Sequence, residues 1–390
     1  MRRVLVLNHF AKAPDQPGGN RHVDLFSRLE QWDVRIIAAD RNNMSDERQR
    51  SAPGAPITYI PTFGGRSTLA RVAGWVSYAA GAVLAGIAGR RPHAVYASSP
   101  HLLTALAGYL IALWWRVPWV FEIRDIWPRI LVEMGGMSES SPLYRLLRRL
   151  EHFLYTRADR VVYLAAGNRD YLIGEGVPES RLTFIPNSVA PTTPRLARDE
   201  ARSRFDFRGV VAAYTGAHGL ANGLELLLDA SEDLAEHFPE LMIVMMGDGS
   251  EKPRLVENAQ RRGLTNVRFD PPIAKRELPD FYAGVDVGVH VLRDVELFRH
   301  GVSPNKVVDY FAAGLPVVTN SPGEVGDLVE RAQAGVVTSP DGLSKGLREL
   351  LAMQPGERSK LGRNGRVFAE THRNPDLMAS ELQRTLDEIC

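Results

Sequence analysis

The chain has 390 residues, of which 44% are hydrophobic and 24% charged, and its formal net charge at pH 7 is +1. This length exceeds the size at which one core normally divides, so two domains are expected. The single cysteine, Cys390, excludes an internal disulfide framework and a cysteine-based metal site, as is typical of a reducing compartment. The apolar run at residues 4–7 is too short for a signal peptide and is expected to form the first strand.

The charge is unevenly distributed along the chain. Residues 1–190 hold 23 Lys and Arg against 16 Asp and Glu, a net charge of +7, so residues 191–390 carry −6 of the total of +1. The basic residues are scattered arginines without interleaved aromatic residues, which does not favour nucleic acid as a partner. Two segments without charge, 72–88 and 102–115, are short for the roughly 20 residues that span a bilayer. They are expected to be helices, either buried or in contact with a membrane surface.

Apolar runs with the length of strands alternate with helical patterns along the whole chain. Uninterrupted apolar strands of this kind predict parallel sheets that helices cover on both faces, and therefore an α/β fold with two sheets. The proline-rich segment 186–194 reads as the linker between them. The expected strands are 4–7, 34–38, 94–97, 119–123, 161–164 and 183–185, then 210–214, 242–246, 267–269, 285–290, 316–319 and 335–337.

Each half begins with a strand followed by a glycine-bearing loop. The first loop contains Gly18 and Gly19, and the second runs from Gly216 to Gly223. Loops at the carboxyl ends of parallel strands are where open α/β sheets bind ligands. Neither loop has the glycine pattern of a dehydrogenase or of a P-loop ATPase, so those two classes gain little support.

The segment 301–319 reads as a loop, a capped helix, a turn and a buried strand. Ser303 is a natural N-cap, and Pro304 suits the first helical position. The free amides at such a helix start favour an anion, and Lys306 adds a full positive charge. Asp309 lies on the same helical face, where its carboxylate can accept hydrogen bonds from a sugar diol. The segment alone leaves open a nucleotide-sugar site or an ordinary helix with a weak surface pair.

Several short motifs in the second half occur in the order found in glycosyltransferase family 4, and this half resembles that family of retaining enzymes. In the first half, Pro17-Gly-Gly19 resembles the flexible glycine loop of the family. The run from Phe121 to Pro128 resembles the subgroup that assembles surface polysaccharides on lipid carriers, of the O-antigen or colanic-acid type, which transfers deoxy or N-acetylamino sugars. The motifs of the second half lie at 185–189, 214–216, 244–249, 266–269, 278–283, 285–286 and 301–319.

The resemblance implies the GT-B fold, in which two Rossmann-like domains have parallel sheets that face each other across a cleft. It implies an acceptor-binding domain at 1–190, a nucleotide-sugar-binding domain at 191–372 and a C-terminal helix at 373–390 that packs back on the first domain.

Two departures from the family pattern concern the donor. The family commonly carries two glutamates eight positions apart, whereas this chain has Gly301 and Asp309 at these positions. The phosphate-binding cations after the first strand of the second domain are also replaced, by Ala217 and Asn222. Lys306, with help from Arg299, is therefore expected to supply the positive charge for the diphosphate.

The resemblance implies a reaction in which the acceptor attacks on the face that the leaving group occupies and a donor phosphate oxygen takes the proton. We expect no cofactor and no metal, because no Asp-x-Asp motif occurs. Helix amides near Asn305 and the Lys306 ammonium are expected to stabilise the leaving phosphate instead. The predicted catalytic residues are His101, Asp125 and Lys306. The predicted donor-binding residues are Gly18, Gly19, Asn187, Gly216, His218, Gly247, Asp248, Gly249, Arg299, Ser303, Pro304, Asn305, Lys306 and Asp309.

Structural roles compete with these functional ones. His101 also suits a helix cap, and Asp125 suits the cap of the turn before Pro128. Asp248 is expected to shape a turn near the nucleobase, Asn187 also fits plain turn chemistry, and a solvated loop histidine is the simplest interpretation of His218. The remaining histidines without metal-ligand spacing are expected to be structural: His9, His290 and His300.

The sequence therefore predicts a retaining glycosyltransferase that moves a sugar from a UDP-linked donor to a polyprenyl-diphosphate-linked saccharide. The predicted location is cytoplasmic, peripheral at the inner face of the cytoplasmic membrane, with contact through the N-terminal domain. The alternatives are a non-catalytic subunit that binds a nucleotide sugar and a transferase with a soluble acceptor. A sugar-nucleotide epimerase would need acid and base residues on both faces of the sugar, and no such set can be assembled.

Overall fold

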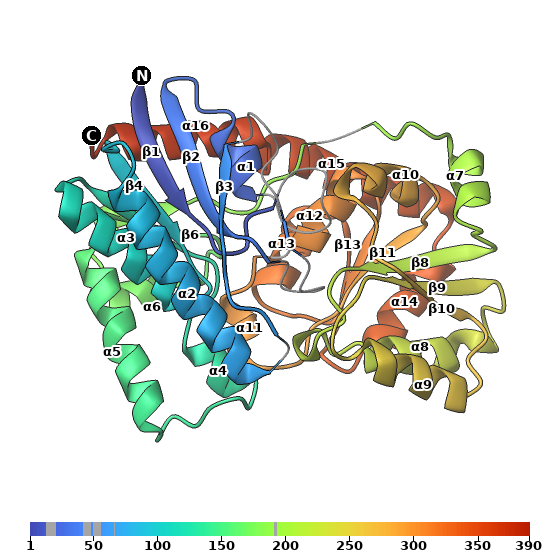
Figure 1. Ribbon diagram of the computed structural model, residues 1–390. Coiled ribbons are helices and arrows are strands. Elements are labelled where there is room, and N and C mark those ends of the chain that lie inside the picture. The colour runs from blue at the N-terminus through green and yellow to red at the C-terminus, as the bar shows by residue number, and fades with distance from the viewer. Residues whose placement is uncertain (13–20, 42–47, 50–55, 66, 191–192, 304) are drawn as a thin grey trace. The chain divides into compact units, whose positions relative to one another are not determined.

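The computed structural model describes residues 1–12, 21–41, 48–49, 56–65, 67–190, 193–303 and 305–390. The chain folds into two compact units (Figure 1). Unit 1 consists of Met1–Pro186 together with Pro375–Cys390, and unit 2 consists of Asn187–Asn374.

Unit 1 is built on a parallel sheet of seven strands in the order β3-β2-β1-β4-β5-β6-β7. Its strands are β1 (Arg2–Leu7), β2 (Trp32–Ala39), β3 (Ile57–Ile60), β4 (Ala94–Ser98), β5 (Trp119–Ile123), β6 (Arg160–Tyr163) and β7 (Leu182–Phe184). Its helices are α1 (Arg21–Phe26), α2 (Thr68–Ile87), α3 (Leu102–Trp115), α4 (Arg129–Glu133), α5 (Pro142–Arg157), α6 (Asn168–Gly174) and α16 (Pro375–Asp387).

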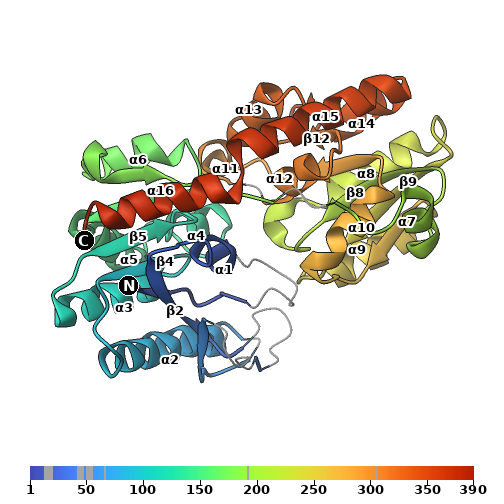
Figure 2. The same cartoon turned by 90° about the horizontal axis from the view of Figure 1, so that it is seen from above.

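Helices cover both faces of this sheet, because successive side chains of a strand point to opposite faces. Leu5 and Leu7 of β1 belong to a core that α2, α3 and α5 complete. Val4 and Val6 belong to a second core, to which α1 and α16 contribute. Figure 1 shows α2 and α3 crossing one face of the sheet, and Figure 2 shows α16 on the side away from α2.

Unit 2 repeats this plan with a parallel sheet of six strands in the order β10-β9-β8-β11-β12-β13. One of its cores contains residues of α10, α12, α13 and α15, and the other contains residues of α8, α9 and α14. Its strands are β8 (Val210–Thr215), β9 (Leu241–Met246), β10 (Val267–Asp270), β11 (Val287–His290), β12 (Val317–Thr319) and β13 (Gly335–Val337). Its helices are α7 (Arg198–Arg204), α8 (Glu225–Ala235), α9 (Lys252–Arg261), α10 (Leu278–Ala283), α11 (Glu296–His300), α12 (Asn305–Ala312), α13 (Glu324–Arg331), α14 (Leu343–Ala352) and α15 (Pro355–His372).

The predicted α/β class with two parallel sheets is confirmed, and every predicted strand is present within a few residues. The prediction missed β3, a strand of four residues at the edge of its sheet between Pro56 and Pro61. The uncharged segments 72–88 and 102–115 form α2 and α3, and the bounds of α3 agree with the prediction.

Strand order reverses at two places, between β1 and β4 in unit 1 and between β8 and β11 in unit 2. In doubly wound sheets ligands bind outside the carboxyl ends of the strands at such a reversal. The loops after β1 and β4, and the loop after β8, therefore mark where each unit is expected to hold a ligand.

Candidate active site

Lys306 lies at the carboxyl edge of the unit 2 sheet, where α12 carries it to the loop after β8. Its Nζ atom is 5.1 Å from the ring centroid of Tyr214, a cation–π geometry, and donates to Oδ1 of Asn222 at 3.3 Å. A Cβ atom at Gly216 would lie 2.8 Å from Cε of Lys306. The glycine therefore allows the lysine stem to cross the strand end at close range.

Burial lowers the pKa of the Lys306 ammonium to about 8, and the charge of Asp309 opposes this shift. The ammonium is still mainly protonated at pH 7. A cation that is partly stripped of water interacts more strongly with an anionic ligand than an exposed lysine does. The influence of the Asp309 charge on Lys306 agrees with the prediction that the two residues lie on the same face of the helix, while their roles toward a donor stay predictions.

The loops after β8 and β9 pass each other closely, and glycines permit this contact. At Gly247, whose φ is 149°, a Cβ atom would lie 1.8 Å from the carbonyl oxygen of Gly216. At Gly249, whose φ is 157°, a Cβ atom would lie 2.4 Å from the carbonyl oxygen of His218. Any side chain at either position would force the two loops apart.

His218 is fully buried between these loops rather than solvated. Its Nδ1 and Nε2 atoms have no hydrogen-bond partner within the part of the chain that the structure describes. Burial lowers its pKa to about 4, and the charges of Lys252 and Lys306 act in the same direction. The interpretation as a solvated loop histidine is therefore wrong, since the imidazole is buried and neutral at pH 7.

Asp248 and Lys252 shape the loop after β9. The exposed Asp248 accepts a hydrogen bond from the amide of Gly249 at 2.8 Å, which agrees with its predicted turn role. Lys252 was not predicted from the sequence. Its Nζ atom donates to the carbonyl oxygens of Gly247 at 2.7 Å and Asp270 at 3.0 Å and so ties the ends of β9 and β10 together.

Asn187 connects the start of unit 2 to the segment before α12. Its amide Nδ2 donates to the carbonyl oxygen of Ser303 at 2.9 Å and to the Ser303 hydroxyl at 3.1 Å. Oδ1 of Asn187 is buried and has no partner among the described residues. Asn187 is therefore more than a turn residue, because it holds the backbone that leads to Lys306.

Arg299 was expected to help bind the donor diphosphate, and Gly301 occupies the position of a family glutamate. The Arg299 guanidinium pairs with Asp294 through contacts of 2.8 to 3.1 Å, so its charge is already partly neutralised. Gly301 has a φ of −132°, which any residue adopts, so its backbone conformation does not explain the glycine. The predicted site residues Gly18, Gly19 and Pro304 lie outside the described residues.

In unit 1, His101 caps the N-terminus of α3. Its Nδ1 atom accepts from the amide of Thr104 at 3.3 Å, and its side chain is 1% exposed. Burial, together with the neighbouring His9, holds the pKa of His101 well below its usual value. The structural alternative for His101 is thus present in the fold, and contact with a donor stays a prediction.

Asp125 lies half-buried after β5. Burial raises the pKa of its carboxyl, and the neighbouring Arg124 opposes this shift. The N-cap position of α4 is occupied by Pro128, and no side chain caps that helix. Its raised pKa moves this carboxyl in the direction that suits a general base near neutral pH.

The sequence prediction missed a buried polar cluster around Glu122 of β5. The carboxylate of Glu122 accepts from Arg21, from Tyr96 at 2.6 Å and from Ser98 at 2.8 Å. Arg21 also donates to the carbonyl oxygens at positions 185 and 186, where unit 1 ends. A glutamate inside an apolar strand was the available signal, because a buried charge needs partners.

His22 adjoins the same cluster. Its Nε2 lies 2.8 Å from Oε1 of Glu122, and Nδ2 of Asn8 lies 2.7 Å from its Nδ1. An amide donor requires Nδ1 to accept, which suits a neutral ring, and burial lowers the pKa of His22. The cluster joins the loop after β1, helix α1 and strands β4 and β5 at the edge where a ligand is expected.

The arrangement of these groups in unit 2 suits an anionic ligand. Lys306 supplies the charge, the N-terminal amides of α12 add their dipoles, and glycine loops allow a ligand to approach the backbone. Among the described residues, no group of three or more His, Cys, Asp or Glu side chains could hold a metal ion.

Comparison with known families decides the assignment. Residues 26–188 match the family described as glycosyl transferase 4-like domain, and residues 209–353 match the glycosyl transferases group 1. The chain belongs to glycosyltransferase family 4. The members of this family are retaining enzymes, and the two matched regions fall in unit 1 and in unit 2.

Relatives of this family 4 chain are distant. It is 26% identical over 231 residues to the probable glycosyltransferase WbjE of Pseudomonas aeruginosa, and the match spans 56% of this chain and 55% of WbjE. It is 25% identical over 303 residues to WcaI of Escherichia coli K12, which is named a putative colanic acid biosynthesis glycosyl transferase. This match spans 74% of each chain. The chain thus covers about half the length of WbjE.

Solved structures confirm the GT-B fold. The crystal structure of HepE from Anabaena, in complex with UDP-glucose, is similar with a TM-score of 0.74 and 17% sequence identity. The similarity covers 100% of both chains.

Proposed function

We propose that this chain transfers a sugar, with retention, from a UDP-linked donor to a polyprenyl-diphosphate-linked saccharide in the synthesis of a bacterial surface polysaccharide. The position of Lys306 carries the donor half of this proposal. Its ammonium is held against Gly216 and over the ring of Tyr214 at the strand reversal of unit 2. Negative charge develops on the leaving diphosphate as the glycosidic bond breaks, and a partly buried cation stabilises it.

The neighbouring groups fit the remaining parts of such a donor. Asp309, on the same face of α12 as Lys306, suits the ribose diol. His218 is neutral and has buried nitrogens without partners among the described residues, so it can donate to or accept from a ligand. The choice of UDP is supported by the fold shared with HepE, whose crystal structure contains UDP-glucose.

The acceptor half rests on the surface of unit 1. Helix α2 is long and apolar enough to cross a membrane by length and composition, and only 22% of its most apolar window is buried. Its inner face packs closely, because Cβ atoms at Gly81 and Gly86 would lie 2.4 Å from Ile60 and 2.6 Å from Ile111. We therefore propose that α2 stays on the sheet and meets the membrane with its outer face.

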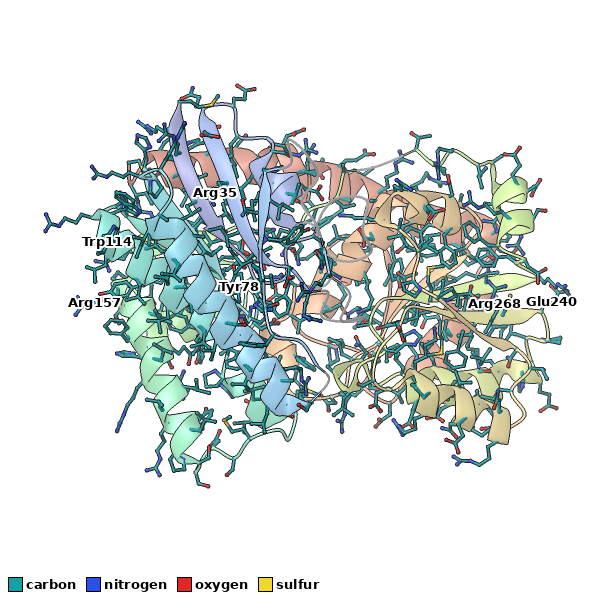
Figure 3. All side chains as sticks on the ribbon, in the orientation of Figure 1. Arg35, Tyr78, Trp114, Arg157, Glu240 and Arg268 are labelled. Carbon is teal, nitrogen blue, oxygen red and sulfur yellow. The ribbon has the colours of Figure 1, made fainter. Side chains whose placement is uncertain are left out.

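The outer faces of α2 and α3 expose large apolar side chains: Leu69, Val72, Val76, Leu84, Leu110, Leu113 and Trp114. Figure 3 places Trp114 at the outer margin of unit 1. Between Glu47 and Glu122 the sequence has no acidic residue and seven arginines. Apolar surface beside an excess of positive charge suits an anionic bilayer, which supports the proposal that the enzyme contacts the cytoplasmic face of the membrane.

The test is incubation of the full chain with a panel of labelled nucleotide sugars and polyprenyl-diphosphate-linked saccharides, with mass spectrometry of the lipid product. The proposal predicts one sugar added to the lipid-linked acceptor with release of UDP. Transfer only to water-soluble glycans would show that the acceptor is a soluble glycan and not a lipid-linked one. Donor binding without transfer to any acceptor would favour a non-catalytic subunit, an outcome that the pairing of Arg299 with Asp294 makes worth testing.

A further inference from the structure

Six aromatic side chains gather at the carboxyl edge of the unit 1 sheet, beside the strand reversal, and one of them, Phe10, adjoins His9 with centroids 4.5 Å apart. The imidazole rings of His9 and His101 meet edge to face with centroids 4.7 Å apart, and Tyr78 adjoins His9 at 4.6 Å. Trp75 stacks on His101 with centroids 5.2 Å apart and an interplanar angle of 21°. Trp127 meets Trp75 edge to face at 5.6 Å. The two indoles thus form one half-exposed surface above a buried base.

The base of this cluster is neutral. Burial lowers the pKa of His9 to about 4 and that of His101 well below its usual value. Nδ1 of His9 is buried without a hydrogen-bond partner in the part of the chain that the structure describes. The indoles therefore rest on uncharged rings, and the surface they form is apolar in character.

The indole of Trp75 lies at the boundary between two faces of α2. Tyr78, one turn further on, is buried and donates to the carbonyl oxygen of Ile37 at 2.8 Å. Val72 and Val76 flank Trp75 on the other side and are 42% and 53% exposed. The aromatic surface therefore continues directly into the apolar outer face of the helix.

Arginines border the same surface. Arg71 is exposed and lies one helical turn before Trp75, so both project from the same side of α2. Arg124 and Arg129 are half-buried and lie three residues before and two residues after Trp127. Arg129 lies 3.7 Å from Glu133, so the three cations stand against the two carboxylates of Asp125 and Glu133, and a net positive charge remains. A ligand at this surface would meet apolar rings on one side and positive charge on the other.

We propose that Trp75, Trp127 and Arg71 form a binding site for a prenyl diphosphate, in which the first isoprene units pack on the indoles and the diphosphate pairs with the arginine. This inference rests on the proposed function, and it identifies the part of unit 1 that holds the lipid carrier of the acceptor. The chain of the carrier leaves along Val72 and Val76 toward the bilayer. The diphosphate lies beside Asp125, which then faces the saccharide that follows it.

Calorimetry with three probes tests this site on the full chain: farnesyl diphosphate, inorganic diphosphate and farnesol. We expect farnesyl diphosphate to bind at least tenfold more tightly than either part alone. Trp75→Ala and Arg71→Ala each weaken it at least tenfold, and Trp75→Phe and Arg71→Lys restore most of the affinity. Leu377→Ala, which truncates an exposed apolar side chain on α16 of the same unit, leaves it unchanged.

Two results would overturn the site: equal affinity of the wild type and Trp75→Ala for farnesyl diphosphate, or inorganic diphosphate binding as tightly as the prenylated form. Circular dichroism of each variant ensures that a loss of binding is not a loss of folding. Slow hydrolysis of the nucleotide-sugar donor without acceptor separates the two proposals. If Trp75→Ala keeps both donor hydrolysis and farnesyl diphosphate binding, the site fails while the proposed transferase stands.

Discussion

A Cβ atom at Gly216 would lie 2.8 Å from Cε of Lys306, so the absence of a side chain at position 216 leaves the lysine stem room to lie across the loop after β8. These two residues are 90 positions apart, and the sequence motifs that contain them are both altered relative to the family pattern. Lys306 and the glycine that admits it form one unit of the proposed donor site.

A methyl group at position 216 should therefore displace Lys306. We expect Gly216→Ala to lower kcat/KM for the nucleotide sugar at least tenfold. Gly263→Ala is the matched control, because Gly263 also has a positive φ, of 66°, but has no neighbouring atom within 4 Å of the added Cβ. Both variants should lose about 1 to 3 kcal/mol of stability through backbone strain. Equal activity of the two variants would show that the contact with Lys306 has no functional role.

The lowered pKa of Lys306 predicts how activity depends on pH. With a pKa of about 8, the ammonium loses its proton well before an ordinary lysine does. We expect kcat/KM to fall as pH rises above about 8, because kcat/KM reports the ionisation of the free enzyme. A pH profile of kcat/KM between 6 and 10 measures this. A profile that stays flat up to pH 10 would contradict the assignment.

The same shift has a consequence for stability. The pKa of Lys306 is lower in the folded state than its usual value of 10.5, so the unfolded chain binds more protons between about pH 8 and 10.5. The free energy of unfolding of the wild type, relative to Lys306→Met, should therefore rise with pH through this window. Urea unfolding at pH 7.5 and 9.5 measures the change, and a relative stability that falls with pH would refute it.

Glu122 is expected to be among the least replaceable polar residues of unit 1. Its side chain is fully buried, and removal would leave the Arg21 guanidinium, 9% exposed, without its carboxylate. We expect Glu122→Ala to cost about 3 to 5 kcal/mol of unfolding free energy. The control Asp33→Ala breaks an exposed pair with Arg3 and should cost under about 1 kcal/mol. If urea denaturation gave a similar loss of unfolding free energy for both variants, the buried cluster would not stabilise unit 1 as proposed.

The pKa of Glu122 sets the pH range of this contribution. Burial alone would raise that pKa, but the Arg21 charge and several hydrogen bonds reverse the shift and hold it well below 4.5. The stabilisation is therefore present above about pH 4.5 and is lost as pH falls through the folded-state pKa.

Membrane contact through α2 and α3 is tested by co-sedimentation with vesicles. We expect binding to vesicles that contain phosphatidylglycerol, with at least tenfold weaker binding of Leu84→Glu and Trp114→Glu. These substitutions place a charge on the exposed apolar surface. Leu377→Glu adds the same charge on α16 and should bind as the wild type does. If the Leu84 and Trp114 variants bind vesicles as tightly as the wild type does, the membrane contact lies on another surface.

Much of the fold follows from the sequence, because apolar strands and capped helices leave local signals. The strands β1 and β8 and the helices α3 and α12 lie within a few residues of where the sequence predicted them. Strand β3 was missed, since four residues between prolines at the edge of a sheet carry too weak a pattern.

The site was only partly predictable, because its contacts join distant segments. Motif order identified Lys306 and Gly216 separately, but their contact depends on how α12 packs on the sheet. The Glu122 cluster and the stacking of Trp75 on His101 each join segments more than 20 residues apart, and no local pattern marks them. The interpretation of His218 as a solvated loop histidine was wrong, because the glycine-bearing loops around it pack closely and bury its side chain.

The role of Lys306 in the donor site is measured by the rate of sugar transfer by Lys306→Ala. We expect a kcat/KM at least a hundredfold below that of the wild type, which corresponds to about 3 kcal/mol of transition-state stabilisation. Lys360→Ala, which removes an exposed lysine of α15 in the same unit, should retain wild-type activity. Wild-type turnover by a folded Lys306→Ala would contradict the proposed donor site.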